Sequence, residues 1–580
     1  MLLCLTVYLP GFFRLPPVDR DESRFAQASR QMFESVALPA EQQQRGVITT
    51  WDGAEAPGMH SGGLAIPMVQ NRARLNKPPL IYWAQAGGAA IATGGDPLRD
   101  AIWMYRIPSL LAGLATALLT WRLGCRMLDP RAAWLGGALL GIAPVFVWEA
   151  HQARADMLLV TITTGAMLAL WTIWRAGRRR SVRRAPWAAA AGLWILIGLG
   201  VLTKGPVTPM VVGLSALALC ATTGRWRWLL GLRPVAGIVI VVAMVAPWVI
   251  AVGQQIGWEQ YAQTVIAETL GRSAAPREGH FGPPGYHALL AVPLLWPGSM
   301  LIGLALPRAW RKARGAARGA RIAGEGTPSL RSGLFCGRDA ETFLVCWIVP
   351  SWIVFELVMT KLPHYTMPLY PALALLCARA VLAAETGRLA GLGRRIVRVA
   401  LAGFGVLSAA LVGAAVVAGV VGLLGSPVGL AAVAMFSVLG VSLLWRWAWL
   451  VRLGRFAAAQ GTLVGVAVAL WACTLGATLP GARAPWVSSA VMAQAPAPLS
   501  RLGAIEYHED SLMFLTRARM DRIDRGGLEA WLGEHPDGVI VGPSEAISDA
   551  AGLEQIGVVE GFNYARGKWV RLSVARRGAP

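Results

Sequence analysis

Long apolar stretches separated by short polar segments dominate the pattern of hydrophobic and polar positions along the chain. A membrane-spanning helix needs about 20 consecutive apolar residues. Windows of this kind lie at 103–123, 132–149, 155–174, 186–202, 205–222, 233–253, 287–306, 342–360, 365–384, 397–424, 428–446 and 459–479. With the shorter apolar segment 1–13, which we expect to be a first crossing with a trimmed start, they predict a mostly α-helical membrane bundle of about 13 helices.

Basic residues fall mainly in alternate gaps between these windows. Because cytoplasmic loops retain Lys and Arg, the clusters within 175–184, 308–321 and 388–398 assign those gaps to the cytoplasm. Counting the short window 78–93 as a crossing would move these clusters outside, so we expect a juxtamembrane helix at the outer interface there. The outer face then receives residues 15–102, the turn at 154–156, residues 254–286, the turn at 361–364 and everything from about 480 onward.

The pattern changes near residue 480. Four prolines between 480 and 498 mark a linker, after which charged and apolar residues alternate. The segment 528–534 predicts a helix, 538–541 a buried strand and 568–574 a half-exposed strand. We therefore expect a transmembrane region at 1–480, with a first periplasmic loop and juxtamembrane helices at 15–102, and a small periplasmic α/β domain at 481–580.

Composition supports a membrane protein and excludes other classes. Hydrophobic residues make up 55% of the chain and charged residues 15%, and the mean hydropathy is +0.50. The net charge of +22 does not indicate nucleic-acid binding, because the basic residues are divided into short runs between apolar stretches. The seven cysteines include no CxxC pair, so neither a zinc ribbon nor a disulfide framework is supported.

Carboxylates stand at two places on the predicted outer face. Asp21 and Glu22 open the first loop directly after two prolines, a position that also suits a helix N-terminus, where acids complement the helix dipole. Asp156 lies at the outer end of an apolar window, where a carboxylate is costly unless it is paired or hydrated. It has either a functional role or an ion pair with Arg154 or Arg24 that fixes helix packing.

Cations and a phenol gather in the outer turns. The ammonium of Lys77 precedes two prolines and suits a phosphate at headgroup depth, although a snorkelling lysine explains it equally well. The other candidates on this face are Lys204, Arg272, His280, Lys361 and Tyr365. For the lysines the alternative is an ordinary helix end, and for His280 it is a solvated loop.

Seven short segments occur in a fixed order up to about residue 385. They are Asp21-Glu22-Ser23-Arg24-Phe25-Ala26, Lys77-Pro78-Pro79 with Tyr82-Trp83, Arg106-Ile107-Pro108-Ser109, Arg154-Ala155-Asp156, Thr203-Lys204-Gly205-Pro206, Arg272 with His280, and Lys361-Leu362-Pro363-His364-Tyr365. Together they resemble the bacterial glycosyltransferases of the GT-C superfamily, especially the aminoarabinose lipid A transferases and the related protein O-mannosyltransferase-like enzymes.

The resemblance implies inverting transfer of one sugar from an undecaprenyl-phosphate donor to lipid A or another envelope glycolipid or polysaccharide. It places the reaction at the periplasmic face of the bacterial inner membrane. Asp21 would act on the acceptor hydroxyl, with Asp156 and Glu22 as supporting acids held by Arg24. The residues implied to stabilise the leaving phosphate are Lys77, Arg272, His280 and Tyr365, with Lys204 and Lys361 in support.

One departure from this family concerns a Tyr-Phe-Glu-Lys-Pro stretch, which here is Arg74-Leu75-Asn76-Lys77-Pro78. The glutamate associated with a bound metal is absent, so we assign no metal ligands and no certain cofactor. The alternative is a transporter or flippase of lipid-linked precursors. A transporter would place ionisable groups near mid-membrane in both halves. Here these groups lie at one outer face, which favours the enzyme. A third hypothesis is an inactive relative that serves as an envelope assembly factor.

Overall fold

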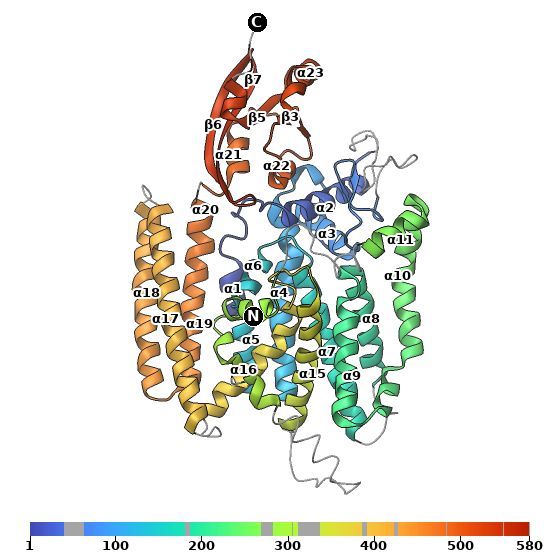
Figure 1. The fold of residues 1–580 in the computed structure, drawn as a ribbon, viewed down its shortest axis with the longest axis vertical. Helices are drawn as coiled ribbons and strands as arrows, with labels where there is room; N and C mark the ends of the chain where they lie inside the picture. The colour runs from blue at the N-terminus through green and yellow to red at the C-terminus, as the bar shows by residue number, and fades with distance from the viewer. Residues whose placement is uncertain are drawn as a thin grey trace.

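The structure is a computed structural model of the 580-residue chain. It describes residues 1–39, 63–179, 186–267, 282–303, 305–310, 337–385, 391–422, 427–482, 484–548, 550 and 552–578. Figure 1 shows a bundle of long helices, above which lie shorter helices and a β-sheet near the C-terminal end.

Nine helices in the described part of the chain are long and apolar enough to cross a membrane. They are α4 (Ile102–Met127), α7 (Asp156–Arg179), α8 (Trp187–Lys204), α10 (Pro234–Ile256), α15 (Gly337–Leu357), α16 (Tyr370–Glu385), α17 (Gly391–Gly422), α18 (Pro427–Arg452) and α19 (Phe456–Cys473). The pair α5 (Pro130–Gly141) and α6 (Pro144–Ala150), bent by 59°, gives a possible tenth span. The predicted helical membrane bundle is confirmed, whereas the predicted count of thirteen is not.

Three predicted crossings account for the difference. The one after α8 is α9 (Val207–Thr223), an apolar helix of only 17 residues. The window at 287–306 begins as α13 (Tyr286–Leu294) and continues as the 3₁₀ turn η5 (Ser299–Leu301), because its prolines remove backbone donors that a continuous helix needs. The opening segment forms α1 (Leu2–Tyr8).

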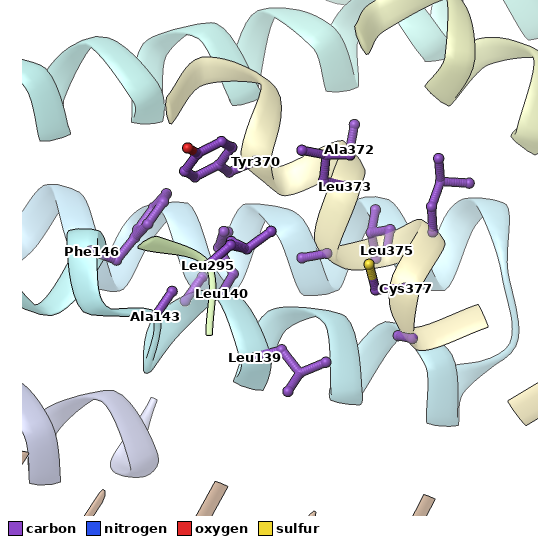
Figure 2. Packing of buried hydrophobic residues seen from close by; sticks show 14 of the residues in the cluster. Leu139, Leu140, Ala143, Phe146, Leu295, Tyr370, Ala372, Leu373, Leu375 and Cys377 are labelled. Atoms are coloured by element: carbon purple, nitrogen blue, oxygen red, sulfur yellow. The ribbon is translucent and has the colours of Figure 1, made fainter. Parts of the chain in front are cut away.

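The core of the bundle lies where α16 packs against α5 and α4. Figure 2 shows Leu375 of α16 beside α5, the helix that carries Leu139 and Leu140. These helices approach closely because two glycines face α16. A Cβ added at Gly124 would lie 2.8 Å from Leu375 Cδ2 and from Ala133 Cα, and one at Gly136 would lie 2.9 Å from Leu375 Cδ2, so a larger side chain at either position requires these neighbours to shift.

Short helices cover the top of the bundle. α2 (Asp21–Ala37) and α3 (Leu80–Thr93) pack on one another, and α3 also packs on α4 (Figure 1). α3 corresponds to the window that we expected as a juxtamembrane helix. It ends at Gly94, whose φ of +66° is a backbone conformation that glycine adopts without strain.

The C-terminal part contains a five-stranded sheet. Its strands are β3 (Leu502–Ala504), β4 (Met520–Arg522), β5 (Val539–Pro543), β6 (Leu553–Asn563) and β7 (Lys568–Arg577), in the order β4-β3-β5-β7-β6. β3 is parallel to β4 and β5, whereas β7 is antiparallel to β5 and β6. The predicted helix at 528–534 is α23 (Leu528–Glu534), and the two predicted strands are β5 and β7. The domain boundary at residue 480 stays a prediction.

Ion pairs join α2 to the segment around α22 (Asp510–Leu515). Arg30 donates to the carbonyl of Phe514 at 2.6 Å and to Asp100 at 2.6 Å. Arg517 donates to Asp100 at 2.5 Å and to Glu34 at 2.8 Å. The Asp100 side chain is fully buried, so its charge depends on these two guanidinium groups.

We expect Arg517→Ala to lower the free energy of unfolding by about 3 kcal/mol, because the substitution leaves buried Asp100 with one cation fewer. Thermal unfolding of the purified protein in detergent measures the change. Arg571→Ala is the matched control, since Arg571 pairs with Glu560 at the surface and should leave stability unchanged. Equal stability of the two variants would contradict the assigned role of Arg517.

Candidate functional site

A cavity of about 690 Å³ lies between the helical bundle and the residues that precede α3. Its walls are mostly apolar and come from α7, α9, α10, α11 (Trp258–Ile266) and α15. Representative wall residues are Val160, Met210, Val249, Val265 and Phe355. Polar lining residues are Asn76, Lys77, Asp156, Lys204, Tyr261, Thr360, His364 and Tyr365. The cavity can therefore hold a molecule with a long apolar part and a charged head.

Asp156 and Lys204 form an ion pair in this cavity. Asp156 begins α7 and Lys204 ends α8, so these consecutive helices bring the two charged groups together. Lys204 Nζ lies 2.5 Å from Asp156 Oδ1. His364 Nε2 lies 3.6 Å from the same oxygen, and Arg154 Nη2 lies 3.9 Å from Oδ2. The carboxylate is thus partnered at the mouth of the bundle, as its low exposure requires.

Arg154 connects this pair to two further acids. Its Nη1 donates to Glu149 Oε1 at 2.9 Å, and its Nη2 lies 3.5 Å from Asp21 Oδ2. The same Nη2 lies 3.3 Å from His364 Nε2. One guanidinium group therefore joins α2, α6, the start of α7 and the turn before α16.

Asp21 stands at the N-terminus of α2, and its side chain is 45% exposed. Arg74 Nη2 lies 3.7 Å from Oδ1, and Arg74 is itself held by Tyr82 Oη at 3.2 Å. Burial by itself would raise the pKa of Asp21, but the charges of Arg154, Arg74 and Lys77 outweigh it and hold the pKa below its usual range. Asp21 is therefore a carboxylate at neutral pH.

The structure brings together many of the predicted site residues. Asp156, Lys77, Lys204 and Tyr365 line the cavity, and Lys204 Nζ lies 5.0 Å from the centre of the Tyr365 ring. Asp21 joins them through Arg154. Two other predicted residues, Arg272 and His280, lie outside the described residues.

Three predicted residues serve other contacts. Glu22 is 1% exposed and accepts two hydrogen bonds from Arg106, at 2.8 and 2.9 Å. It also accepts from the amides of residues 18 and 153, so it ties the first loop to α4 and to the Arg154 turn. Arg24 pairs with Asp510 at 2.8 Å. We expected Arg24 to hold the acids of the site in place, but in the structure its partner is this acid of the C-terminal part. Lys361 donates to the carbonyl of Gly282 at 2.7 Å.

Sequence reasoning gave no role to Glu149, Arg106, Arg74 or His364. Glu149 had a detectable signal, because it is an acid inside an apolar window. Arg106 and His364 lie within the recognised segments, but nothing local identifies their partners. Among the described residues, no three His, Cys, Asp or Glu side chains form a group that would hold a metal ion.

Comparison with known sequences identifies relatives over part of the chain. Residues 76–250 match the family model described as dolichyl-phosphate-mannose-protein mannosyltransferase. An undecaprenyl phosphate-alpha-4-amino-4-deoxy-L-arabinose arabinosyl transferase from Pseudomonas aeruginosa is 28% identical over 53% of this chain and 49% of its own length. One of the same name from Pseudomonas savastanoi pv. phaseolicola is 26% identical over 62% of this chain and 56% of its own length. The chain therefore spans about half the length of the curated relatives that it matches.

Comparison with solved structures establishes the fold. The crystal structure of ArnT from Cupriavidus metallidurans bound to undecaprenyl phosphate superposes with a TM-score of 0.69 at 19% identity. The superposition covers 100% of this chain and 98% of that one. The chain has a GT-C fold. Its resemblance to the aminoarabinose lipid A transferases, first seen in short segments, is confirmed, and it is a multi-pass inner-membrane protein.

His364 makes stability depend on pH. Burial, together with the cations Arg154 and Lys204, outweighs nearby Asp156 and lowers the pKa of His364 to about 3. Since an unfolded imidazole has a pKa of about 6.5, only the unfolded chain gains this proton as the pH falls from about 6.5 towards 3. We expect His364→Gln to reduce the stability lost between pH 7.5 and pH 5 by about 2 kcal/mol, measured by thermal unfolding. Identical pH dependence in both proteins would contradict this.

Glu22→Ala should destabilise the fold by about 3 to 5 kcal/mol, because it leaves the fully buried guanidinium of Arg106 without its carboxylate. Thermal unfolding and the yield of folded protein in detergent measure this loss directly. A Glu22→Ala protein that unfolds at the wild-type temperature but has lost activity would instead support the predicted role of Glu22 as a supporting acid in catalysis.

Proposed function

We propose that this protein is a glycosyltransferase that moves one sugar from an undecaprenyl-phosphate donor to an envelope acceptor such as lipid A. The observation that carries the proposal is the apolar cavity whose polar end holds Lys77 and Lys204 beside Asp156, with Asp21 linked through Arg154. The curated relatives bear the name of such transferases. The similar ArnT crystal structure is described as bound to undecaprenyl phosphate.

The cavity provides for both parts of the donor. Its apolar walls match a polyprenyl chain, and the ammonium groups of Lys77 and Lys204 match the phosphate. As the glycosidic bond breaks, the phosphate changes from a diester with one negative charge to a monoester that carries more. Fixed cations stabilise that increase in the transition state, and loss of one such group typically costs a factor of 10² to 10³ in rate. Tyr365 lies beside Lys204 and belongs to the same phosphate site.

The acids serve the acceptor side. The acceptor hydroxyl oxygen attacks the anomeric carbon opposite the phosphate, and the carbon–oxygen bond to the phosphate breaks with its electron pair remaining on the phosphate oxygen. The hydroxyl proton passes to Asp21 and then to solvent, to which Asp21 is partly exposed. Because the pKa of Asp21 is low, it takes the proton late, after oxocarbenium character has made the hydroxyl more acidic. A single displacement of this kind inverts the anomeric centre.

Asp156 and Arg154 hold this machinery in place. Asp156 orients Lys204 through the 2.5 Å contact, and Arg154 fixes Asp21 relative to that pair. The distribution of basic loops supports a periplasmic position for the site. Arg272 and His280, implied by the family resemblance, remain proposed phosphate ligands. The gathering of charged groups at one end of the cavity favours this enzyme over a transporter.

The test is incubation of the purified protein with radiolabelled undecaprenyl-phosphate sugars and envelope extract, followed by separation of the lipid fractions. Wild-type protein should label an envelope lipid, and Asp21→Asn should lower kcat by about 10²- to 10³-fold. Glu560→Gln, which changes an exposed acid of the sheet, should retain full activity. Absence of label in every fraction would refute the transferase and favour a transporter.

A further inference from the structure

We infer that Glu149 is a positioning residue, which keeps the guanidinium group of Arg154 on the acceptor side of the cavity and away from the donor phosphate. The inference rests on the proposed transfer reaction and gives a role to an acid that the reaction does not use directly. Two observations carry it: the burial of Glu149 outside the cavity, and the unequal lengths of the contacts that Arg154 makes.

Glu149 is buried and does not line the cavity. It is the acid of the otherwise apolar helix α6, and it is 2% exposed. It is not among the residues that form the cavity walls, so it does not touch a donor bound there. Its Oε1 accepts a hydrogen bond from Arg154, whereas its Oε2 is buried without a hydrogen-bond partner among the described residues. A buried carboxylate is costly without a cation, so its contact with Arg154 is the one that stabilises it.

Glu149 also makes the shortest contact of the Arg154 guanidinium group in the described part of the chain. Nη1 lies 2.9 Å from Glu149 Oε1, whereas Nη2 lies 3.5 Å from Asp21 Oδ2 and 3.9 Å from Asp156 Oδ2. Nε is buried without a hydrogen-bond partner among the described residues. The bond to Glu149 therefore sets the orientation of the guanidinium plane, and the contact with Asp21 depends on that orientation.

Arg154 lies close enough to the polar end of the cavity to compete for the phosphate. Its Nη2 is 3.3 Å from Nε2 of His364, which lines the cavity. A guanidinium fork fits phosphate oxygens well, and the phosphate becomes more negative as the glycosidic bond breaks. Without the bond to Glu149, we expect Arg154 to turn towards the phosphate. That turn would weaken the support of Asp21 and retain the product undecaprenyl phosphate.

Substitution of Glu149 tests the inference in the full-length protein in detergent. Glu149→Gln removes the charge that restrains Arg154. We expect equilibrium binding of radiolabelled undecaprenyl phosphate to become about threefold to tenfold tighter, and kcat for sugar transfer to fall about tenfold. A purely structural defect would weaken binding and kcat together. Unchanged or weaker binding of undecaprenyl phosphate by Glu149→Gln would therefore overturn the inference.

Two further variants separate charge from folding. Glu341→Gln is the matched control, because Glu341 is 1% exposed and pairs with Arg379 of the next helix at 3.0 Å. Glu341 lies near the start of α15, whereas the end of that helix lines the cavity. This variant should lose stability but keep the wild-type affinity. Glu149→Asp retains the charge and should keep the wild-type affinity and most of kcat. Binding by Glu149→Asp as tight as that by Glu149→Gln would overturn the inference.

A double variant shows whether the effect passes through Arg154. Glu149→Gln combined with Arg154→Gln removes both partners of the buried pair, so neither charge is left alone, and it stays informative if Glu149→Gln does not fold. We expect the double variant to bind undecaprenyl phosphate no more tightly than the wild-type protein does. Tighter binding would show that the gain does not come from Arg154 and would overturn the inference.

Equilibrium binding separates this inference from the proposed function. Wild-type protein that binds undecaprenyl phosphate but transfers no sugar would count against the transferase alone. The affinities of the variants would then still support or contradict the role of Glu149. Wild-type protein that does not bind undecaprenyl phosphate would overturn both.

Discussion

The guanidinium group of Arg154 is the interaction on which the site depends. It contacts Glu149 and Asp21, lies 3.9 Å from Asp156, and is only 14% exposed. Carboxylates grouped so closely at the end of an apolar bundle repel one another and lose hydration, and a shared cation offsets both costs. Each acid comes from a different helix, so the same contacts that neutralise the charges also fix α2, α6 and α7 relative to one another.

The position of α2 is determined from two sides. Below it, Glu22 and Arg106 form a fully buried bidentate pair that ties the start of the helix to α4. Above it, Arg30 donates to the Phe514 carbonyl, and its guanidinium carbon lies 3.7 Å from the centre of the Phe514 ring. Asp21, one residue before Glu22, is therefore held on a rigid element although its own side chain is partly exposed. This is the arrangement that a positioned carboxylate needs.

Hydropathy and charge were sufficient to predict the helical bundle, the juxtamembrane helix at 78–93 and a common outer face for Asp21, Lys77, Asp156 and Lys204, whereas one shared site was implied by the family resemblance. These signals are local: a long apolar run, a carboxylate at a helix end, a lysine before prolines. The partner of Arg24 was not predictable, because Asp510 lies in the last hundred residues and many acids compete for one guanidinium group. The structural role of Glu22 was missed because Asp21 and Glu22 are adjacent acids with the same local sequence pattern. Only the structure shows that Asp21 is partly exposed and Glu22 is buried.

The broken window at 287–306 shows a different limit. Its hydropathy suits a spanning helix, yet its prolines divide it into shorter turns, so mean hydropathy overestimates the number of crossings where proline is frequent. Lys361 illustrates a third limit. Its flexible chain reaches a backbone carbonyl, and such carbonyl partners have no sequence signature.

The contact between Arg30 and Phe514 joins residues that are 484 positions apart. During synthesis α2 therefore leaves the ribosome long before its partner, and the membrane helices insert while α2 lacks that contact. α2, which begins at Asp21, gains this contact only after the last segment has been made and has folded against it. Chains interrupted before that point contain all the residues that line the cavity but lack this contact to the helix that carries Asp21.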